Sequence, residues 1–286
     1  MDLSRFITDV GKACGCLVWL LALLLSGCAG LSPQLRLQSA ENMAAAVGWQ
    51  EIRLPTTDFV LAGFIPKDVR DNDLLTIYIE GDGLAWISRW QISPDPTPIH
   101  PTGLQLALHH PHGAAAYLAR PCQFVSADDR RNCAQIWWTD RRFAEEVVAA
   151  TDQAVEQLKQ RFHANNIELV GYSGGGAIAA LVAARRKDVV RLLTVAGNLD
   201  HQAWTQHHHA TPLTGSLNPA DAWQALVAVP QVHFIGGSDT IVSRDIAQSF
   251  VAHFPSNNRP QLREIKGFDH LCCWVKKWPE LYAGEK

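Results

Sequence analysis

Apolar residues occur along this chain in short continuous runs that alternate with longer stretches at helical spacing. A short continuous run predicts a strand that is buried on both faces, as in a parallel sheet. Such runs occupy 74–80, 114–119 and 189–196, and three more lead into Gly171, Gly236 and Gly267. Helical spacing is clearest at 139–162, where the recurring apolar residues are Phe143, Val147, Ala150, Ala154 and Leu158. Strands that alternate with helices predict an α/β fold with a mostly parallel sheet.

The segments between these runs complete the outline. Residues 49–65 form two extended runs split at Pro55, which predicts an antiparallel edge for the sheet. Shorter helices are predicted in three segments, at 103–109, 174–186 and 219–228. Two stretches are expected to be loops, 87–103 with its four prolines and 197–219.

One of the predicted strands runs directly into a serine. Residues 171–175 read Gly-Tyr-Ser-Gly-Gly, and a long Ala-rich helical stretch follows at once. The turn in such a motif is strained, and side chains two positions before or after the serine would collide with the neighbouring strand or helix. This is the pattern of a nucleophile elbow, which offers Ser173 as a nucleophile.

A serine nucleophile needs a base and an acid, and both occur downstream in the expected order. Asp239 lies in a Gly-rich turn after one apolar strand, and His270 lies in the loop after the next. Ligand sites of open α/β sheets lie at the carboxyl ends of the strands, where these residues are predicted. His270 would take the proton of Ser173, and Asp239 would hold the imidazole in the required tautomer. Asp200, after the strand at 189–196, is an alternative acid.

The reaction also needs hydrogen-bond donors for a developing oxyanion. One should be the backbone N–H of Gly174, the residue after the nucleophile. The second should come from the loop after the strand at 74–80, where Gly81 and Gly83 let the backbone turn inward. Either Asp82 or Gly83 could supply that N–H.

These motifs resemble those of the α/β-hydrolase superfamily over roughly residues 50–280. The resemblance depends on Gly-Tyr-Ser-Gly-Gly at 171–175, Gly-Ser-Asp at 237–239 and Gly-Phe-Asp-His at 267–270. It implies an eight-stranded, mostly parallel sheet flanked by helices, and hydrolysis of a small acyl substrate through an acyl-enzyme without a cofactor. The sequence Glu-Gly-Asp-Gly at 80–83 departs from the His-Gly-Gly-Gly type of loop that lipases and esterases carry there.

The segment 197–219 stands where many members of that superfamily insert a lid or cap. About twenty residues are too few for a large cap domain, so an open site is expected. Five tryptophans could line an apolar pocket or pack in the core, those at 86, 90, 137, 138 and 204.

The leading interpretation is a serine hydrolase that cleaves a carboxylic ester or thioester. A peptidase or amidase of the same fold is an alternative, and so is a lipoprotein that keeps the fold as a non-catalytic binding or assembly module. A further alternative is dinucleotide binding, because residues 174–179 also fit the pattern G-x-G-x-x-A, with Asp200 about twenty residues on. That alternative leaves Ser173, Asp239 and His270 unexplained.

The N-terminus indicates export. Residues 17–25 are an apolar core of signal-peptide length, and Leu-Ser-Gly-Cys at 25–28 resembles a bacterial lipoprotein box. We therefore expect residues 1–27 to be a signal peptide, 28–48 a tether lipidated on Cys28 with some helical character at 40–47, and 49–286 the hydrolase domain. An uncleaved anchor is the alternative. Alanine after the cysteine favours the outer membrane of the cell envelope, with the domain facing the periplasm.

The cysteines agree with an oxidising compartment. Cys122 and Cys133 enclose ten residues rich in Asp and Arg, which predicts a disulfide that pins a surface loop. Cys272 and Cys273 follow His270, and either both are free or one pairs elsewhere.

Composition excludes some classes of function. A net charge of −3 and a pI near 6.4 give no indication of nucleic-acid binding. Histidines cluster at 109–112 and 207–209, but adjacent histidines cannot all face one ion on a regular element, so no metal site is predicted.

Overall fold

The structure is a computed structural model that describes residues 32–285. The expected signal peptide at 1–27 and the expected lipidation site at Cys28 lie outside the described residues. Within residues 32–285, none of the helices combines the length and the hydropathy needed to span a bilayer.

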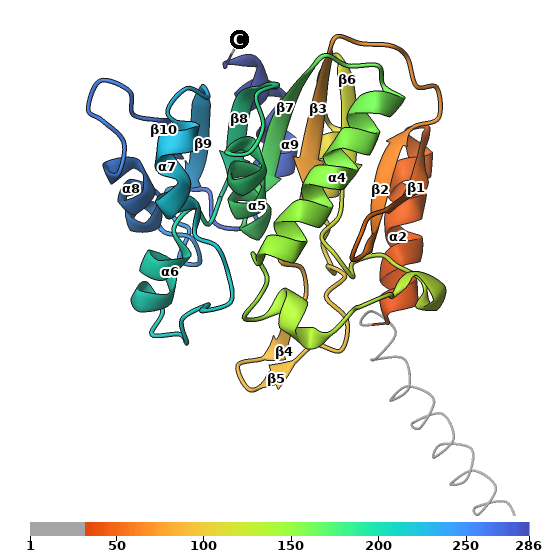
Figure 1. The fold of residues 1–286 in the computed structure, drawn as a ribbon, viewed down its shortest axis with the longest axis horizontal. Coiled ribbons are helices and arrows are strands. Elements are labelled where there is room, and N and C mark those ends of the chain that lie inside the picture. The colour runs from red at the N-terminus through yellow and green to blue at the C-terminus, as the bar shows by residue number, and fades with distance from the viewer. Residues whose placement is uncertain (1–31, 286) are drawn as a thin grey trace, which may run out of the picture.

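An eight-stranded sheet forms the centre of the molecule, in the order β1-β2-β6-β3-β7-β8-β9-β10 (Figure 1). β1 pairs with β2, and β2 with β6, in antiparallel fashion, and all other neighbours are parallel. The strands are β1 (Trp49–Pro55), β2 (Val60–Pro66), β3 (Leu74–Ile79), β6 (Ala114–Leu118), β7 (Asn166–Tyr172), β8 (Val189–Val195), β9 (Gln231–Gly236) and β10 (Gln261–Ile265). The predicted α/β fold with a mostly parallel sheet is confirmed, including its antiparallel edge.

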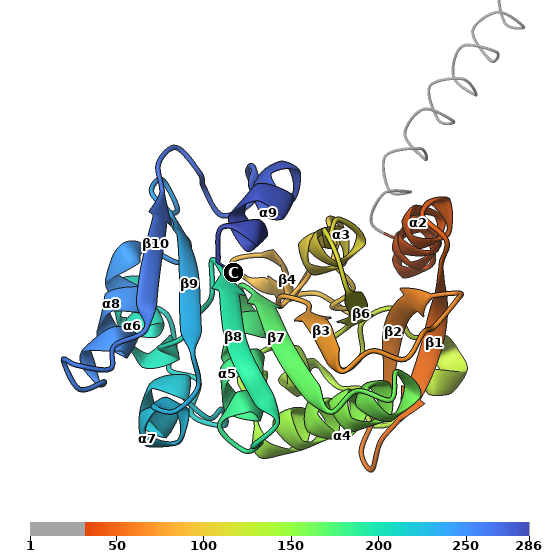
Figure 2. The same cartoon turned by 90° about the horizontal axis from the view of Figure 1, so that it is seen from above.

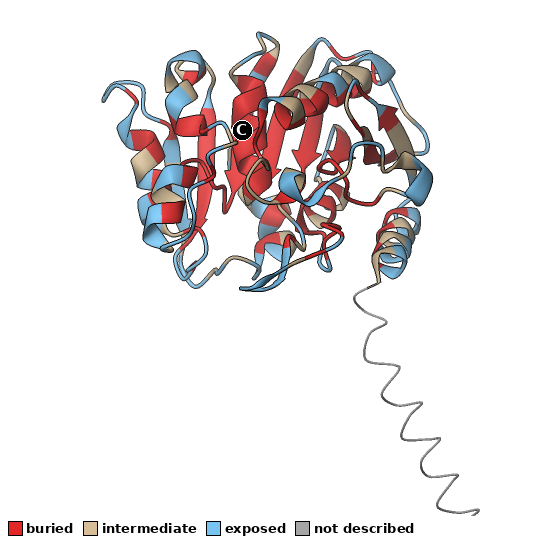
Figure 3. Ribbon diagram, turned by 60° about the horizontal axis from the view of Figure 1, so that its bottom comes forward, coloured by how far each residue is buried: buried red, intermediate tan, exposed pale blue. Residues whose placement is uncertain are grey.

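Helices cover both faces of the sheet (Figure 2). One face is covered by α4 (Glu145–Arg161) and α5 (Gly174–Ala183), with α7 (Trp223–Leu226) and α8 (Arg244–Ala252) beside them. The other face is covered by α2 (Pro33–Ala46), α3 (Thr102–Leu108) and α9 (Trp274–Ala283). The core is therefore split into two apolar clusters by strands that are buried on both sides, which explains the continuous apolar runs (Figure 3).

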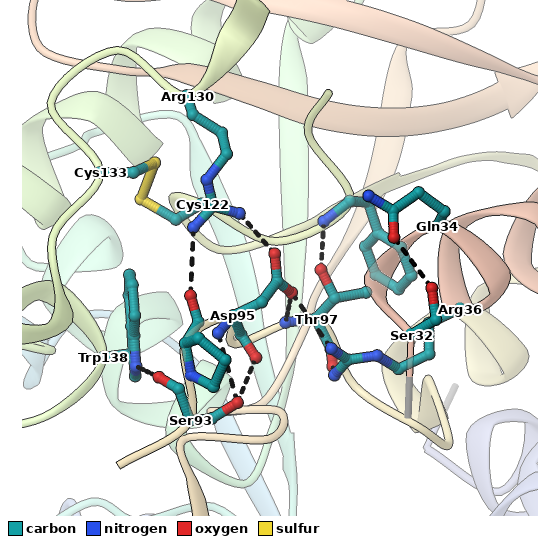
Figure 4. A network of polar contacts seen from close by, with 12 residues as sticks. Ser32, Gln34, Arg36, Ser93, Asp95, Thr97, Cys122, Arg130, Cys133 and Trp138 are labelled. Carbon is teal, nitrogen blue, oxygen red and sulfur yellow. Dashed lines mark hydrogen bonds and ion pairs between the residues drawn. A yellow bond between two sulfur atoms is a disulfide. The ribbon is translucent and has the colours of Figure 1, made fainter. Parts of the chain in front are cut away.

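The expected tether differs from the structure. Residues 33–46 form helix α2, and Ala40 and Ala44 are fully buried against the same apolar cluster as α3 and α9. Arg36 is also buried, and it pairs with Asp95 (Figure 4). Because the buried side chains are mostly alanines, the helix has little apolar periodicity to reveal its packing face. This segment is therefore part of the domain and not a free linker.

The two expected loops contain short elements. Strands β4 (Trp86–Ser88) and β5 (Gln91–Ile92) form a small hairpin, and helix α6 (His201–His207) lies in the 197–219 segment. The helix predicted at 139–162 begins only at Glu145, where two acidic residues open its first turn. The helix predicted at 219–228 is a 3-10 turn, η4 (Pro219–Ala222), followed by α7.

Candidate active site

Ser173 lies at the sharp turn between β7 and α5. Its backbone is in the left-handed half of conformational space, with φ of 51° and ψ of −122°. A Cβ on Gly171 would lie 2.4 Å from the carbonyl oxygen of Gly175, and a Cβ on Gly175 would lie 2.3 Å from that of Ile79. Only glycine fits at either position, as the elbow pattern requires. The strained conformation holds the Ser173 side chain at the carboxyl edge of the sheet.

The structure brings Ser173, His270 and Asp239 together. His270 Nε2 lies 3.0 Å from Ser173 Oγ, and His270 Nδ1 lies 2.8 Å from Asp239 Oδ2. The Asp239 side chain is fully buried, and that of His270 is 12% exposed. A neutral imidazole that donates its Nδ1–H to the carboxylate presents a free lone pair on Nε2 to the serine hydroxyl. The geometry therefore allows His270 to accept the proton of Ser173.

Further contacts hold the turn that carries Asp239 and the loop that carries His270. The other carboxylate oxygen of Asp239 accepts hydrogen bonds from the N–H groups of Ile241 and Val242, at 2.8 and 2.9 Å. The Tyr172 hydroxyl donates to the backbone carbonyl of His270 at 2.9 Å. Asp239 is thus oriented from its own turn, and the His270 loop is tied to the strand that carries the nucleophile.

Asp200, the alternative acid, lies elsewhere. Its carboxylate accepts hydrogen bonds from the N–H groups of Gln202 and Ala203 and so caps the N-terminus of α6. It also accepts from Asn218 at 3.0 Å and from the Ser249 hydroxyl at 2.6 Å. These contacts account for Asp200 as a helix cap, and Asp239 is the carboxylate that accepts the hydrogen bond of His270.

The loop after β3 is held by Glu80, which is completely buried. Its carboxylate accepts hydrogen bonds from the N–H groups of Gly81, Gly103 and Leu104 and from the Tyr117 hydroxyl, at 2.9 to 3.2 Å. Burial raises the pKa of Glu80, and these donors oppose the rise because they favour the ionised form. Glu80 therefore ties the start of the loop to the N-terminus of α3.

Asp82 lies between two arginines and the first residue of α5. Its two carboxylate oxygens pair with Arg120 at 3.2 Å and with Arg142 at 2.9 Å. Burial would raise the pKa of Asp82, but the guanidinium groups of Arg142 and Arg120 outweigh it and hold that pKa below its ordinary value. A Cβ on Gly174 would lie only 2.0 Å from Asp82 Oδ1, so the carboxylate packs directly on this glycine.

Neither arginine was among the candidates taken from the sequence. Arg120 comes two residues after β6, at the same edge of the sheet as the site, and that position is a signal that could have identified it. Arg142 precedes α4 in an irregular segment, and no sequence pattern distinguishes it from a solvated arginine.

Three backbone N–H groups are expected as oxyanion donors, those of Asp82, Gly83 and Gly174. Within the described residues, the structure records no hydrogen-bond acceptor for any of them. They are therefore available to an incoming group, as oxyanion donors must be.

Cys122 and Cys133 are joined by a disulfide beside the buried Asp95 (Figure 4). Cys272 and Cys273 are paired with each other, so the expectation that they are free or that one pairs elsewhere is wrong. Of the five tryptophans considered above, only Trp138 is buried in the core, and Trp90 at the hairpin tip is 80% exposed. In the described part of the chain, no three His, Cys, Asp or Glu side chains are grouped to hold a metal ion.

The fold and the Ser173–His270–Asp239 arrangement define a serine hydrolase of the α/β-hydrolase superfamily. Residues 107–268, more than half of the chain, match the family model described as serine hydrolase (FSH1), and the chain belongs to this family. This membership, with the contacts that join Ser173, His270 and Asp239, favours the serine hydrolase over the dinucleotide-binding alternative.

Solved structures show the same fold at low sequence identity. The esterase Pf2001 of Pyrococcus furiosus is 12% identical, with a TM-score of 0.56 over 83% of this chain and 89% of that one. The α/β hydrolase GrgF of Penicillium sp. sh18 is 15% identical, with a TM-score of 0.56 over 83% and 96%. A puromycin-hydrolyzing peptidase of Mycobacterium tuberculosis is 10% identical, with a TM-score of 0.57 over 83% and 38%. No curated protein sequence matches the chain.

Proposed function

We propose that this serine hydrolase cleaves a carboxylic ester or thioester through an acyl-enzyme on Ser173. The observation that carries the proposal is the pair of hydrogen-bond distances at His270, 3.0 Å to Ser173 Oγ and 2.8 Å to Asp239 Oδ2. A base within reach of the nucleophile and an acid that orients the base are the arrangement that acyl transfer requires.

In this mechanism, Ser173 Oγ attacks the carbonyl carbon while His270 Nε2 takes its proton. Asp239 stabilises the imidazolium that forms. When the tetrahedral intermediate collapses, the bond to the leaving group breaks, and His270 returns the proton to that group. Water then attacks the acyl-enzyme by the same route, which releases the acid and restores Ser173.

The negative charge on the tetrahedral oxygen would be held by backbone donors. We assign these to the N–H of Gly174 and to the N–H of Asp82 or Gly83, which lack protein acceptors. An unpaired carboxylate at Asp82 would repel a negatively charged oxygen nearby. Arg120 and Arg142 pair with both of its oxygens and so reduce that repulsion.

A fluorophosphonate probe tests the nucleophile and its competence together. The wild-type protein should be labelled on Ser173 and should hydrolyse p-nitrophenyl acetate. Ser173→Ala and His270→Ala should lose both properties while their circular dichroism stays that of the wild type. Ser238→Ala, an exposed serine beside Asp239, is the matched control and should keep both. An unlabelled wild type, or labelling at another serine, would contradict the assignment.

An ester and an anilide of the same acyl group separate the esterase from the peptidase or amidase. The amide needs His270 to protonate a poorer leaving group, so the ester reacts faster with either kind of enzyme, and the anilide is the discriminating substrate. We expect it to remain unhydrolysed, and its turnover would favour the peptidase or amidase.

We also propose that Cys28 carries the lipid anchor, after removal of residues 1–27, and that the domain faces the periplasm from the outer membrane. The lipoprotein-type sequence at 25–28 supports this, and so does the disulfide between Cys122 and Cys133, which an oxidising compartment permits. Metabolic labelling with a palmitate analogue should mark the wild type and not Cys28→Ser. Equal labelling of both would contradict the anchor.

A further inference from the structure

Large apolar side chains are exposed on the loops that build the active site. The β4–β5 hairpin, which follows the loop after β3, exposes Trp90, Ile87 and Trp86 by 80, 44 and 42%. Ile241 follows Asp239 by two residues and is 46% exposed, and Leu271 follows His270 and is 59% exposed. Each of these loops follows the carboxyl end of a parallel strand, so the apolar side chains lie at the edge of the sheet that also carries Ser173. We call these five residues the apolar rim.

Hydrogen bonds hold the residues on either side of the β4–β5 hairpin, which we call the hairpin base (84–85 and 93–97). The N–H of Ser93 donates to the carbonyl of Ala85 at 3.0 Å, and the Trp138 indole donates to the carbonyl of Ser93 at 3.0 Å (Figure 4). The hairpin tip has few such contacts, and there the guanidinium of Arg89 lies 4.5 Å over the Trp90 ring. The hairpin tip therefore exposes an aromatic side chain and a cation to solvent, while hydrogen bonds hold the hairpin base in place.

The hairpin base is also joined to helix α2, the first described helix of the chain. Buried Arg36 of α2 pairs with Asp95 and donates to the carbonyl of Thr97, and Arg130 pairs with Asp95 from the other side (Figure 4). The first turn of α2 lies at the same end of the molecule as β4 and β5 (Figure 1). The first described residue, Ser32, thus lies at the end that carries the apolar rim.

We propose that the apolar rim docks on the surface of a phospholipid bilayer, with Trp86 and Trp90 at the depth of the headgroups. Tryptophan favours this depth because its ring is apolar and its N–H is polar, and a cation such as Arg89 can reach the lipid phosphates. The orientation rests on the proposed anchor: Cys28 is four residues before Ser32, and four residues reach at most about 14 Å. A bilayer that holds Cys28 therefore lies close to the end of the molecule that presents the hairpin.

Docking in this way would turn the edge of the sheet that carries Ser173 toward the lipid surface. The proposed hydrolase would then receive an ester carried by the membrane without needing a deep acyl tunnel. A soluble protein partner is the other possible occupant of an exposed apolar surface, and the experiment below distinguishes the two.

The full-length protein is reconstituted in phosphatidylcholine vesicles whose acyl chains carry bromine, a contact quencher of tryptophan fluorescence. The wild type should be quenched, and Trp86→Ser/Trp90→Ser should lose most of that quenching. Leu74→Ser/Val190→Ser, exposed apolar residues at the opposite edge of the sheet, is the matched control and should retain the quenching. Circular dichroism of each variant shows that it is folded.

Equal quenching in the wild type and the tryptophan variant would overturn the proposal and favour a protein partner for the rim. The test is independent of the proposed anchor. If residues 1–27 are retained, Trp19 adds the same quenching to every variant, and the difference between the wild type and Trp86→Ser/Trp90→Ser still reports the hairpin.

Discussion

Gly174→Ala is expected to disable the oxyanion site through a single steric contact. The new Cβ would lie 2.0 Å from Asp82 Oδ1 and 2.5 Å from its Cγ, whereas real Cβ contacts below 3.0 Å are essentially absent. Asp82 would have to move by about 1 Å in a closely packed region. It is held in place by Arg120 and Arg142, at 3.2 and 2.9 Å. Either these ion pairs break or the first turn of α5 shifts, and both outcomes displace the N–H groups assigned to the oxyanion.

The size of the effect follows from that displacement. Losing one oxyanion donor lowers turnover by about 10² to 10³, so kcat/KM for p-nitrophenyl acetate should fall by that factor. Overpacking of this kind costs about 1 to 3 kcal/mol of stability, so the variant should remain folded. Gly284→Ala is the matched control, because the nearest atom to its Cβ would be 3.6 Å away.

A double-mutant cycle identifies the contact. In an Asp82→Ala background the clashing carboxylate is absent, so Gly174→Ala should cost much less there than in the wild type. Wild-type activity in Gly174→Ala would refute this reasoning, and so would an equal loss in both backgrounds.

Three further predictions concern other parts of the molecule. Asp239→Asn should lower kcat by about 10⁴, whereas Asp200→Asn keeps a side-chain oxygen that can cap α6 and should leave kcat/KM nearly unchanged; the reverse ranking in steady-state assays would reassign the acid. Burial raises the pKa of Glu51 from 4.5 to about 7, so stability present below pH 4.5 is lost as the pH rises through 7. Glu51→Gln should therefore be more stable than the wild type by about 1 to 2 kcal/mol at pH 8 but not at pH 4, and equal urea midpoints at pH 8 would contradict the shift. Replacing Cys122 and Cys133 by serine should cost about 3 kcal/mol, measured as a lower Tm under non-reducing conditions, and an unchanged Tm would show that the loop is held by other contacts.

Much of the fold could be predicted because strands buried on both faces leave continuous apolar runs. The approximate location of the site could be predicted for a related reason, since parallel strands deliver Ser173, Asp239 and His270 to one edge of the sheet. The hairpin at 86–92 could not be predicted, because its paired segments are two or three residues long. Helix α2 was mistaken for a tether because its buried contacts involve Ala40, Ala44 and a charged residue, Arg36.

The arginines beside Asp82 show a different limit. Arg120 and Arg142 are twenty-two residues apart and belong to different segments, and only the folded chain places both on one carboxylate. A charged residue is usually solvated, so a sequence pattern gives no reason to expect this cluster.

The buried Glu80 limits how this enzyme could be engineered. Its four donors come from the chain just after β3, from the beginning of α3 and from Tyr117 of β6. Grafting the His-Gly-Gly-Gly loop of a lipase into positions 80–83 would remove their shared acceptor, at about 1 to 3 kcal/mol for each donor left unsatisfied. A successful loop exchange would therefore also have to replace the first turn of α3 and give the Tyr117 hydroxyl a new hydrogen-bond acceptor.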